Sequence, residues 1–214
     1  QPAPTVATWS LDVALPAESY ARVSVAASGK LFYFSTLLVK DGVQQIALYR
    51  LASDGTELEQ LGTDTTLEGI PVSNVGLAVE ELALGEVAVH GFLAAKPKLG
   101  DLPARVFHLL NQGGKTTTNL AGTSYLEGND TVFPQALNIG GTIVGAWIQA
   151  DQTIAVHSAG AARTDTFGAA TSPATTLSLL STAEDKPAVM FTVQSKAGSA
   201  VGTYVETAGQ NRVA

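Results

Sequence analysis

The chain has 214 residues and a formal net charge of −7, with 12 Lys and Arg against 19 Asp and Glu. Nucleic-acid binding draws much of its affinity from clustered cations that neutralise phosphates, so this balance argues against a nucleic-acid partner. Cys is absent, which excludes disulfides, thiol nucleophiles and thiolate metal sites. The length is sufficient for one buried core, and a single domain over residues 1–214 is expected.

The N-terminal stretch QPAPTVATWS begins without Met and resembles a mature end left after removal of a signal peptide. The nearest approach to a continuous apolar run, residues 76–95, contains Glu80, Glu81 and Glu86, so membrane insertion is not expected. These features favour a secreted or cell-surface protein, with the periplasm as a further option.

Residues 8–15 begin a series of segments with the two-residue period of a β-strand. Trp9, Leu11, Val13 and Leu15 share one side, and smaller or polar residues take the other. Further runs rich in apolar, β-branched or aromatic residues predict strands at 21–27, 30–39, 44–51, 56–61, 86–94, 104–110, 142–149, 153–158, 175–181, 188–194 and 201–207. Pairs such as Asp41-Gly42, Gly113-Gly114 and Gly140-Gly141 predict hairpin turns between them.

Residues 76–96 are the one segment whose Ala, Leu and Glu content also fits a helix. Gly85 and Gly91 interrupt that pattern, and residues 86–92 alternate as a strand does. We therefore expect an all-β fold.

The stretch LYRLASDGTELEQLGTDTTLEG, residues 48–69, partly recurs at residues 107–128 without gaps. Turn glycines at 55, 114, 160 and 209 extend the series, with spacings of 59, 46 and 49 residues. Such periods suit propeller blades of four antiparallel strands. The expected units cover residues 20–65, 74–124, 131–170 and 174–214, and residues 5–15 are expected to close the ring as an outer strand of the last blade.

This pattern resembles the β-propeller repeat proteins, and the short hairpins look somewhat like those of propeller lectins. The resemblance implies about four blades, or five if the units are miscounted; a β-sandwich is the alternative fold. Fucose-binding propeller lectins repeat Trp and Arg side chains in every blade. That regular spacing is missing here, so their sugar site is not carried over.

No catalytic motif is present, so no catalytic residue, cofactor or metal ligand is predicted. The run at 113–117, GGKTT, lacks the upstream glycine of a phosphate-binding loop and lies between strands. His90, His108 and His157 each lie in a predicted strand without the spacing of a metal motif, which favours packed or surface histidines. The acidic turns at 54–59 and 127–130 do not match a calcium-binding loop. Whether the chain is an enzyme stays open, with a negative answer favoured.

In a propeller, the loops after the second strand of each blade and those between blades share one face, where ligands usually bind. We call this the loop face. Its candidate ligand-binding residues are Lys40, Asp41, Glu68, Lys96, Lys98, Asp101, Tyr125, Glu127, Asp130 and Asp151. Asn129 begins a glycosylation sequon that matters only in a secreted eukaryotic protein.

Three functions remain open after this reading. The first is a non-enzymatic extracellular binding module that recognises a protein or a glycan through the loop face. The second is a structural or assembly subunit, a homo-oligomer or filament that uses the N-terminal strand. The third is a glycoside hydrolase of the propeller type, which needs two facing carboxylates that the sequence cannot pair.

Overall fold

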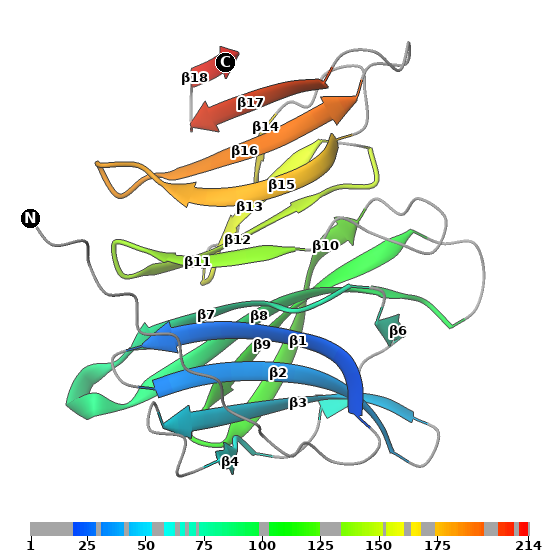
Figure 1. Ribbon diagram of the computed structural model, residues 1–214, viewed down its shortest axis with the longest axis vertical. Coiled ribbons are helices and arrows are strands. Elements are labelled where there is room, and N and C mark those ends of the chain that lie inside the picture. Colours follow the sequence, from blue (N-terminus) through cyan, green and yellow to red (C-terminus); the bar gives the residue numbers. More distant parts are fainter. Residues whose placement is uncertain are drawn as a thin grey trace, which may run out of the picture.

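The chain folds into successive small antiparallel sheets (Figure 1). The computed structural model describes residues 19–28, 31–40, 43–52, 58–62, 65–66, 69–71, 73–98, 103–124, 134–151, 153–160, 164–167, 174–194, 201–207 and 210–213. Within these residues all strand pairs are antiparallel. The same residues contain no helix long and apolar enough to cross a membrane. The prediction of an all-β fold is confirmed.

The first sheet runs in chain order from its inner to its outer strand. It contains β1 (Ser19–Ser28), β2 (Leu31–Lys40), β3 (Val43–Ala52) and β4 (Leu58–Gln60), with β5 (Thr65–Thr66) also paired to β3. Both β4 and β5 pair with β3, so they form one interrupted outer strand.

The second sheet repeats this order with an interrupted inner strand. It contains β6 (Ile70–Pro71) and β7 (Gly76–Glu81), both paired to β8 (Val87–Lys96), followed by β9 (Ala104–Gln112) and β10 (Lys115–Ser124). The segment that also fitted a helix is therefore two strands, β7 and β8. A short 3₁₀ turn joins them at Ala83–Gly85, where Leu84 and Gly85 have φ values of 64° and 77°.

The third and fourth sheets have four strands each. The third contains β11 (Gln135–Ile139), β12 (Thr142–Ile148), β13 (Ile154–Ser158) and β14 (Thr164–Phe167). The fourth contains β15 (Ala174–Ser181), β16 (Pro187–Gln194), β17 (Val201–Thr207) and β18 (Gln210–Val213). The β11–β12 hairpin turns at Gly140 and Gly141, whose φ values of 56° and 82° favour glycine.

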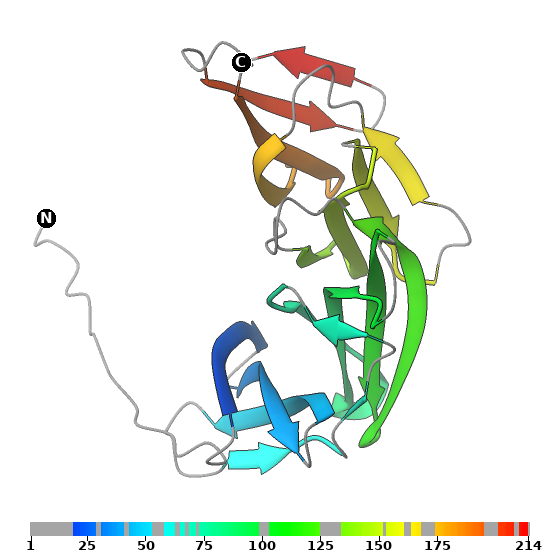
Figure 2. The same cartoon turned by 90° about the vertical axis from the view of Figure 1, so that its right-hand side faces the viewer.

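The four sheets follow one another along an arc, with the first strand of each sheet on the inner side (Figure 2). β7 lies against β1 and β11, and β11 lies against β15. The first and fourth sheets stand at opposite ends of the arc (Figures 1 and 2). Sheets that radiate around an axis are propeller-like, whereas a β-sandwich would stack two larger sheets.

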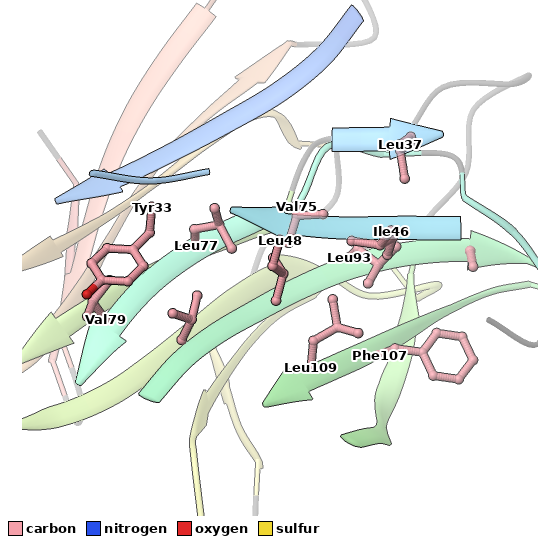
Figure 3. Packing of buried hydrophobic residues seen from close by; sticks show 12 residues of the cluster. Tyr33, Leu37, Ile46, Leu48, Val75, Leu77, Val79, Leu93, Phe107 and Leu109 are labelled. Atoms are coloured by element: carbon pink, nitrogen blue, oxygen red, sulfur yellow. The ribbon is translucent and has the colours of Figure 1, made fainter. Parts of the chain in front are cut away.

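Apolar side chains fill each space between neighbouring sheets. Between the first and second sheets the cluster is mainly aliphatic (Figure 3) and comprises Tyr33, Leu37, Ile46, Leu48, Val75, Leu77, Val79, Val89, Leu93, Ala95, Phe107 and Leu109. Between the second and third sheets, Phe92 and Trp147 lead a second cluster. A third cluster, with Ile148, Ile154 and Val189, joins the third and fourth sheets. The core is thus divided among the spaces between sheets.

Two features expected from the sequence lie outside the described residues. They are the N-terminal strand at 5–15 and the glycosylation sequon at Asn129.

Candidate functional site

The described residues of the loop face lie at equivalent places in successive sheets. Lys40 ends β2 and Lys96 ends β8, while Asp151 lies in the turn after β12. Each follows the second full strand of its sheet, so the topology places them at the same edge of the arc. Lys98 is exposed just beyond Lys96. The remaining candidates lie outside the described residues: Asp41, Glu68, Asp101, Tyr125, Glu127 and Asp130.

Asp151 has a structural role in this turn. Its Oδ1 accepts hydrogen bonds from the Thr153 backbone N–H at 3.0 Å and from the Thr153 hydroxyl at 2.6 Å. These bonds lower the pKa of Asp151, because they favour the charged carboxylate. Asp151 therefore closes the β12–β13 turn through its two hydrogen bonds with Thr153.

A row of polar side chains crosses the first sheet near the end of the sheet that is away from Lys40. Tyr33, Arg50 and Glu59 are direct cross-strand partners on β2, β3 and β4, so their side chains share the face that meets the second sheet. Arg50 forms an ion pair with Glu59 through Nη2 and Oε2. The side chains of Arg50 and Glu59 are 37% and 55% exposed, which leaves both available to a ligand from solvent.

The Tyr33 hydroxyl at the inner end of this row is buried without a hydrogen-bond partner in the described part of the chain. Figure 3 shows Tyr33 beside the aliphatic side chains of the first core cluster. Burial raises the pKa of Tyr33, and the positive charge of nearby Arg50 opposes that shift. The hydroxyl thus lies beside Arg50, whose charge and polar contact both act to lower its pKa, although no hydrogen bond of normal geometry joins the two side chains. An unsatisfied buried hydroxyl is uncommon and points to a water or ligand partner.

A second polar contact joins the two sheets near this row. The Ser28 hydroxyl at the end of β1 donates a hydrogen bond to Oε1 of Glu81 at the end of β7. Both Glu81 and Glu59 are near enough to Tyr33 for their charges to raise its pKa. We call Ser28, Tyr33, Arg50, Glu59 and Glu81 the rim cluster. It combines the donor fork of an arginine with carboxylate and hydroxyl oxygens, a set suited to a ligand with several hydroxyl groups.

Histidines form a separate buried cluster between the second and third sheets. His90 Nε2 lies 3.1 Å from Glu80 Oε2, and His90 Nδ1 lies 3.0 Å from His108 Nε2. With the carboxylate as acceptor, His90 donates from Nε2 and accepts at Nδ1, so His108 donates from its own Nε2. This chain of hydrogen bonds assigns one tautomer to each ring.

Aromatic rings enclose the two histidines. His108 stacks on Phe92 with ring centroids 4.7 Å apart, and Phe92 stacks on Trp147 at 6.2 Å. Burial, with smaller contributions from the charges of His90 and His157, lowers the pKa of His108 to about 4. Burial also lowers the pKa of His90, although Glu80 opposes the shift. Both rings are therefore neutral at pH 7.

This histidine cluster packs the interior. Within the described ranges, no group of three His, Cys, Asp or Glu side chains is placed to hold a metal ion. The sequence reading favoured packed or surface histidines, and His90 and His108 are indeed buried in strands. It did not predict that they contact each other.

Sequence reasoning also missed the rim cluster. A signal was present in the sequence Asp41-Gly42 between β2 and β3, because the hairpin turn that it predicts would fix the register that sets Tyr33 opposite Arg50. The contact with Glu81 had no local signal, because it depends on how two sheets pack.

Comparisons with known proteins support the architecture alone. No family model matches the chain, and no curated protein sequence matches it. Among solved structures, the six-bladed β-propeller fucose lectin of Aleuria aurantia superposes with a TM-score of 0.53 at 15% identity. The chain has a propeller-like fold. Complexes of one variant of that lectin with Fucalpha1-6GlcNAc and with alpha-methyl-L-fucoside superpose equally well, with a TM-score of 0.53 each at 13% and 12% identity.

The superposition covers 91% of this chain but only 60% of the lectin. The chain thus spans about three fifths of the length of its six-bladed neighbour, and the remaining two fifths correspond to roughly two blades.

Proposed function

We propose that the chain is a non-enzymatic carbohydrate-binding module and that the rim cluster contacts the sugar. The observation that carries this proposal is the partly exposed Arg50–Glu59 pair beside the buried Tyr33 hydroxyl, which lies near Arg50 without a hydrogen bond of normal geometry. A saccharide offers adjacent hydroxyl groups that accept from a guanidinium and donate to a carboxylate. Tyr33 supplies a further hydroxyl at the inner end of the row.

The neighbouring structures support the ligand class. The Aleuria aurantia lectin recognises fucose on a propeller, and its complexes contain a fucosylated disaccharide and a methyl fucoside. The identity of 12 to 15% is too low to transfer the binding residues of that lectin to this chain. Fucose is nevertheless the first ligand to test, because it is the sugar that the neighbouring structures bind. Secretion or display at the cell surface fits this function, as does a propeller of four or five blades.

The experiment is titration calorimetry with alpha-methyl-L-fucoside and Fucalpha1-6GlcNAc, together with a glycan array. We expect saturable binding without turnover. Arg50→Ala removes a charged donor and should weaken binding by about tenfold or more. Lys186→Ala is the matched control, because Lys186 forms an exposed ion pair with Glu184 in the fourth sheet. An array without hits, or unchanged affinity in Arg50→Ala, would count against the rim cluster.

The loop face predicted from the sequence is the alternative location for the ligand. Lys96 and Lys98 are the loop-face cations whose side chains the structure describes, the first partly and the second fully exposed. A double variant, Lys96→Ala with Lys98→Ala, separates the two locations. If the double variant loses glycan binding and Arg50→Ala keeps the original affinity, the ligand lies on the loop face. Loss of a protein partner in a pull-down with the same variant would favour the protein-binding form of the hypothesis.

An assembly role is the second candidate function, and the open arc supports it. The first and fourth sheets stand apart in Figure 2. The mass in solution, measured by light scattering over a range of concentrations, tests this role. A concentration-independent monomer that binds glycans would favour the carbohydrate-binding module over an assembly subunit. The glycoside hydrolase stays a hypothesis, because the described residues include only Asp151 among the loop-face carboxylates it would use.

A further inference from the structure

The outer strand of the second sheet, β10, has a long backbone edge without a partner strand. In the described part of the chain β10 pairs with β9 alone. β10 has ten residues, whereas the described outer strands β4, β14 and β18 have three, four and four. In Figure 2 this strand, in green, runs along the outer side of the arc. Its free edge offers unpaired N–H and C=O groups, which another β-strand can bind.

The turn before β10 shows which of its backbone groups point away from β9. The two glycines at 113–114 have φ values of 58° and 74°, the two positive values of a type I′ turn. The residues on either side of such a turn exchange both hydrogen bonds, so the next residue along the strand points its N–H and C=O outward. Outward groups recur at every second residue until the register shifts after Leu120. They are therefore the backbone groups of Thr116, Thr118 and Leu120.

The run from Lys115 to Leu120 lacks the features by which outer strands usually avoid pairing. Such strands are commonly protected by Pro or by several charged residues. This run contains no Pro, and its single charge is Lys115, beside the turn. The side chains at 117–120 alternate between the two faces of the sheet and are all exposed. Neither face of this part of the edge is covered.

The distribution of charge favours a second copy of the same chain as the partner. Two chains that each carry a net charge of −7 repel each other in general. Residues 102–126 contain no Asp or Glu, and β10 lies within this stretch. Two copies can therefore meet along β10 without bringing carboxylates together.

We propose that two copies of the chain pair in antiparallel orientation along β10, about a two-fold axis at Thr118. Thr118 then faces the partner subunit's Thr118, and Thr116 faces the partner subunit's Leu120. Every outward N–H and C=O of the run finds a partner in this register. The two Lys115 side chains lie at opposite ends of the paired strands, so the only charges in the run do not meet. Direct Thr–Thr cross-strand pairs are among the favourable ones.

The dimer joins the second sheets of two arcs into one continuous sheet. No residue of β10 belongs to the rim cluster, so the pairing is independent of the proposed sugar site. One pair of strands is smaller than the interface of about 1,200–2,000 Å² that stable complexes bury. We therefore expect a weak dimer whose population rises with protein concentration.

Charge variants at the two-fold axis test the pairing in the full chain. Sedimentation equilibrium should give a monomer–dimer equilibrium for the unchanged protein. Thr118→Lys and Thr118→Glu each place two like charges opposite each other, so each should raise the dissociation constant by about tenfold or more. An equimolar mixture of the two variants should regain dimers, because opposite charges then face each other. Thr142→Lys, at an exposed residue of the third sheet, is the matched control and should leave the equilibrium unchanged.

Disulfide trapping gives a second readout, because the protein contains no Cys of its own. The two Cα atoms of a hydrogen-bonded antiparallel pair lie about 5.5 Å apart, within the range of about 4.4–6.8 Å that a disulfide spans. Thr118→Cys should therefore form a covalent dimer on mild oxidation. Thr142→Cys should stay largely monomeric under the same conditions.

Four results would overturn the proposal. They are a monomer at every concentration of the unchanged protein; a dimer with the same dissociation constant in Thr118→Lys, which means association through another surface; a mixture of Thr118→Lys and Thr118→Glu that stays monomeric; and equal yields of covalent dimer from Thr118→Cys and Thr142→Cys. Circular dichroism of each variant verifies that the strand content is retained.

Discussion

The space between the first and second sheets and the space between the second and third are built from different side chains. The first is aliphatic inside, with charged groups of the rim cluster at its margin. The second contains Phe92, Trp147 and the hydrogen-bonded pair His90 and His108. We refer to them as the first and second boundaries. The charged side chains of Arg50 and Glu59 at the first boundary reach solvent, whereas His90 and His108 in the second are buried.

Glycine accounts for part of this difference. A Cβ added to Gly145 would lie 2.6 Å from the Phe92 ring, and one added to Gly122 would lie 3.0 Å from Trp147. The missing side chains let both rings lie directly on a neighbouring strand. The second boundary is thus specialised for close packing, and the first retains exposed groups that a ligand can contact. The following predictions test this contrast.

The largest effect is expected for Trp147→Ala at the second boundary. Trp147 is fully buried, and its Nε1–H donates a hydrogen bond to the Thr123 carbonyl at 3.0 Å. Its removal should lower the free energy of unfolding by about 3–5 kcal/mol. Leu48→Ala, the comparison at the first boundary, should cost less, about 2–3 kcal/mol. Urea unfolding followed by circular dichroism measures both, and an equal or larger loss in Leu48→Ala would contradict the contrast.

A pH effect of intermediate size is expected from the second boundary. Burial lowers the pKa of His108 to about 4, so the unfolded chain binds more protons than the folded chain between pH 6.5 and pH 4. The contribution of neutral His108 to the free energy of unfolding is therefore fully present above pH 6.5 and is lost as the pH drops toward 4. The loss assigned to His108 is about 3 kcal/mol.

His108→Gln isolates this effect, since its amide can donate to His90 Nδ1 but does not titrate in this range. Unfolding by urea at a series of pH values should show a shallower slope in the variant. His157→Gln is the comparison, because burial lowers the pKa of His157 as well and its ring contacts Phe92 and Trp147. An unchanged slope in His108→Gln would assign the pH dependence to other groups.

Much of the fold could be predicted from the sequence, because its signals are local. Alternation along β2 and β3 and the glycine pairs at 113–114 and 140–141 specify strands and turns within a few residues. The composition of 76–96 was ambiguous, and the turn at Leu84 and Gly85 together with pairing to β9 settled it as two strands. The arc itself depends on contacts between sheets, which no local pattern encodes.

The candidate site was harder to predict for the same reason. Lys96 and Asp151 lie at the edge that the topology implied, yet Asp151 binds its own turn. Tyr33 and Arg50 lie on β2 and β3, which only two residues separate along the chain, whereas residues 97–103 separate β8 from β9 and leave the pairing of His90 with His108 unspecified. Residues brought together by a tight turn can be paired from sequence; those joined by a long loop or by sheet packing cannot.

The smallest effect on stability is expected from the ion pair at the first boundary. Arg50 and Glu59 are both substantially exposed, so solvent screens their attraction, and such pairs contribute about 0–1 kcal/mol. Arg50→Ala, Glu59→Ala and the double variant should therefore unfold at nearly the urea concentration of the unchanged protein. A coupling energy above about 2 kcal/mol in this cycle would make the pair a structural element. A small coupling energy combined with lost glycan binding would instead mean that the first boundary retains these charges for a ligand, because packing does not require them.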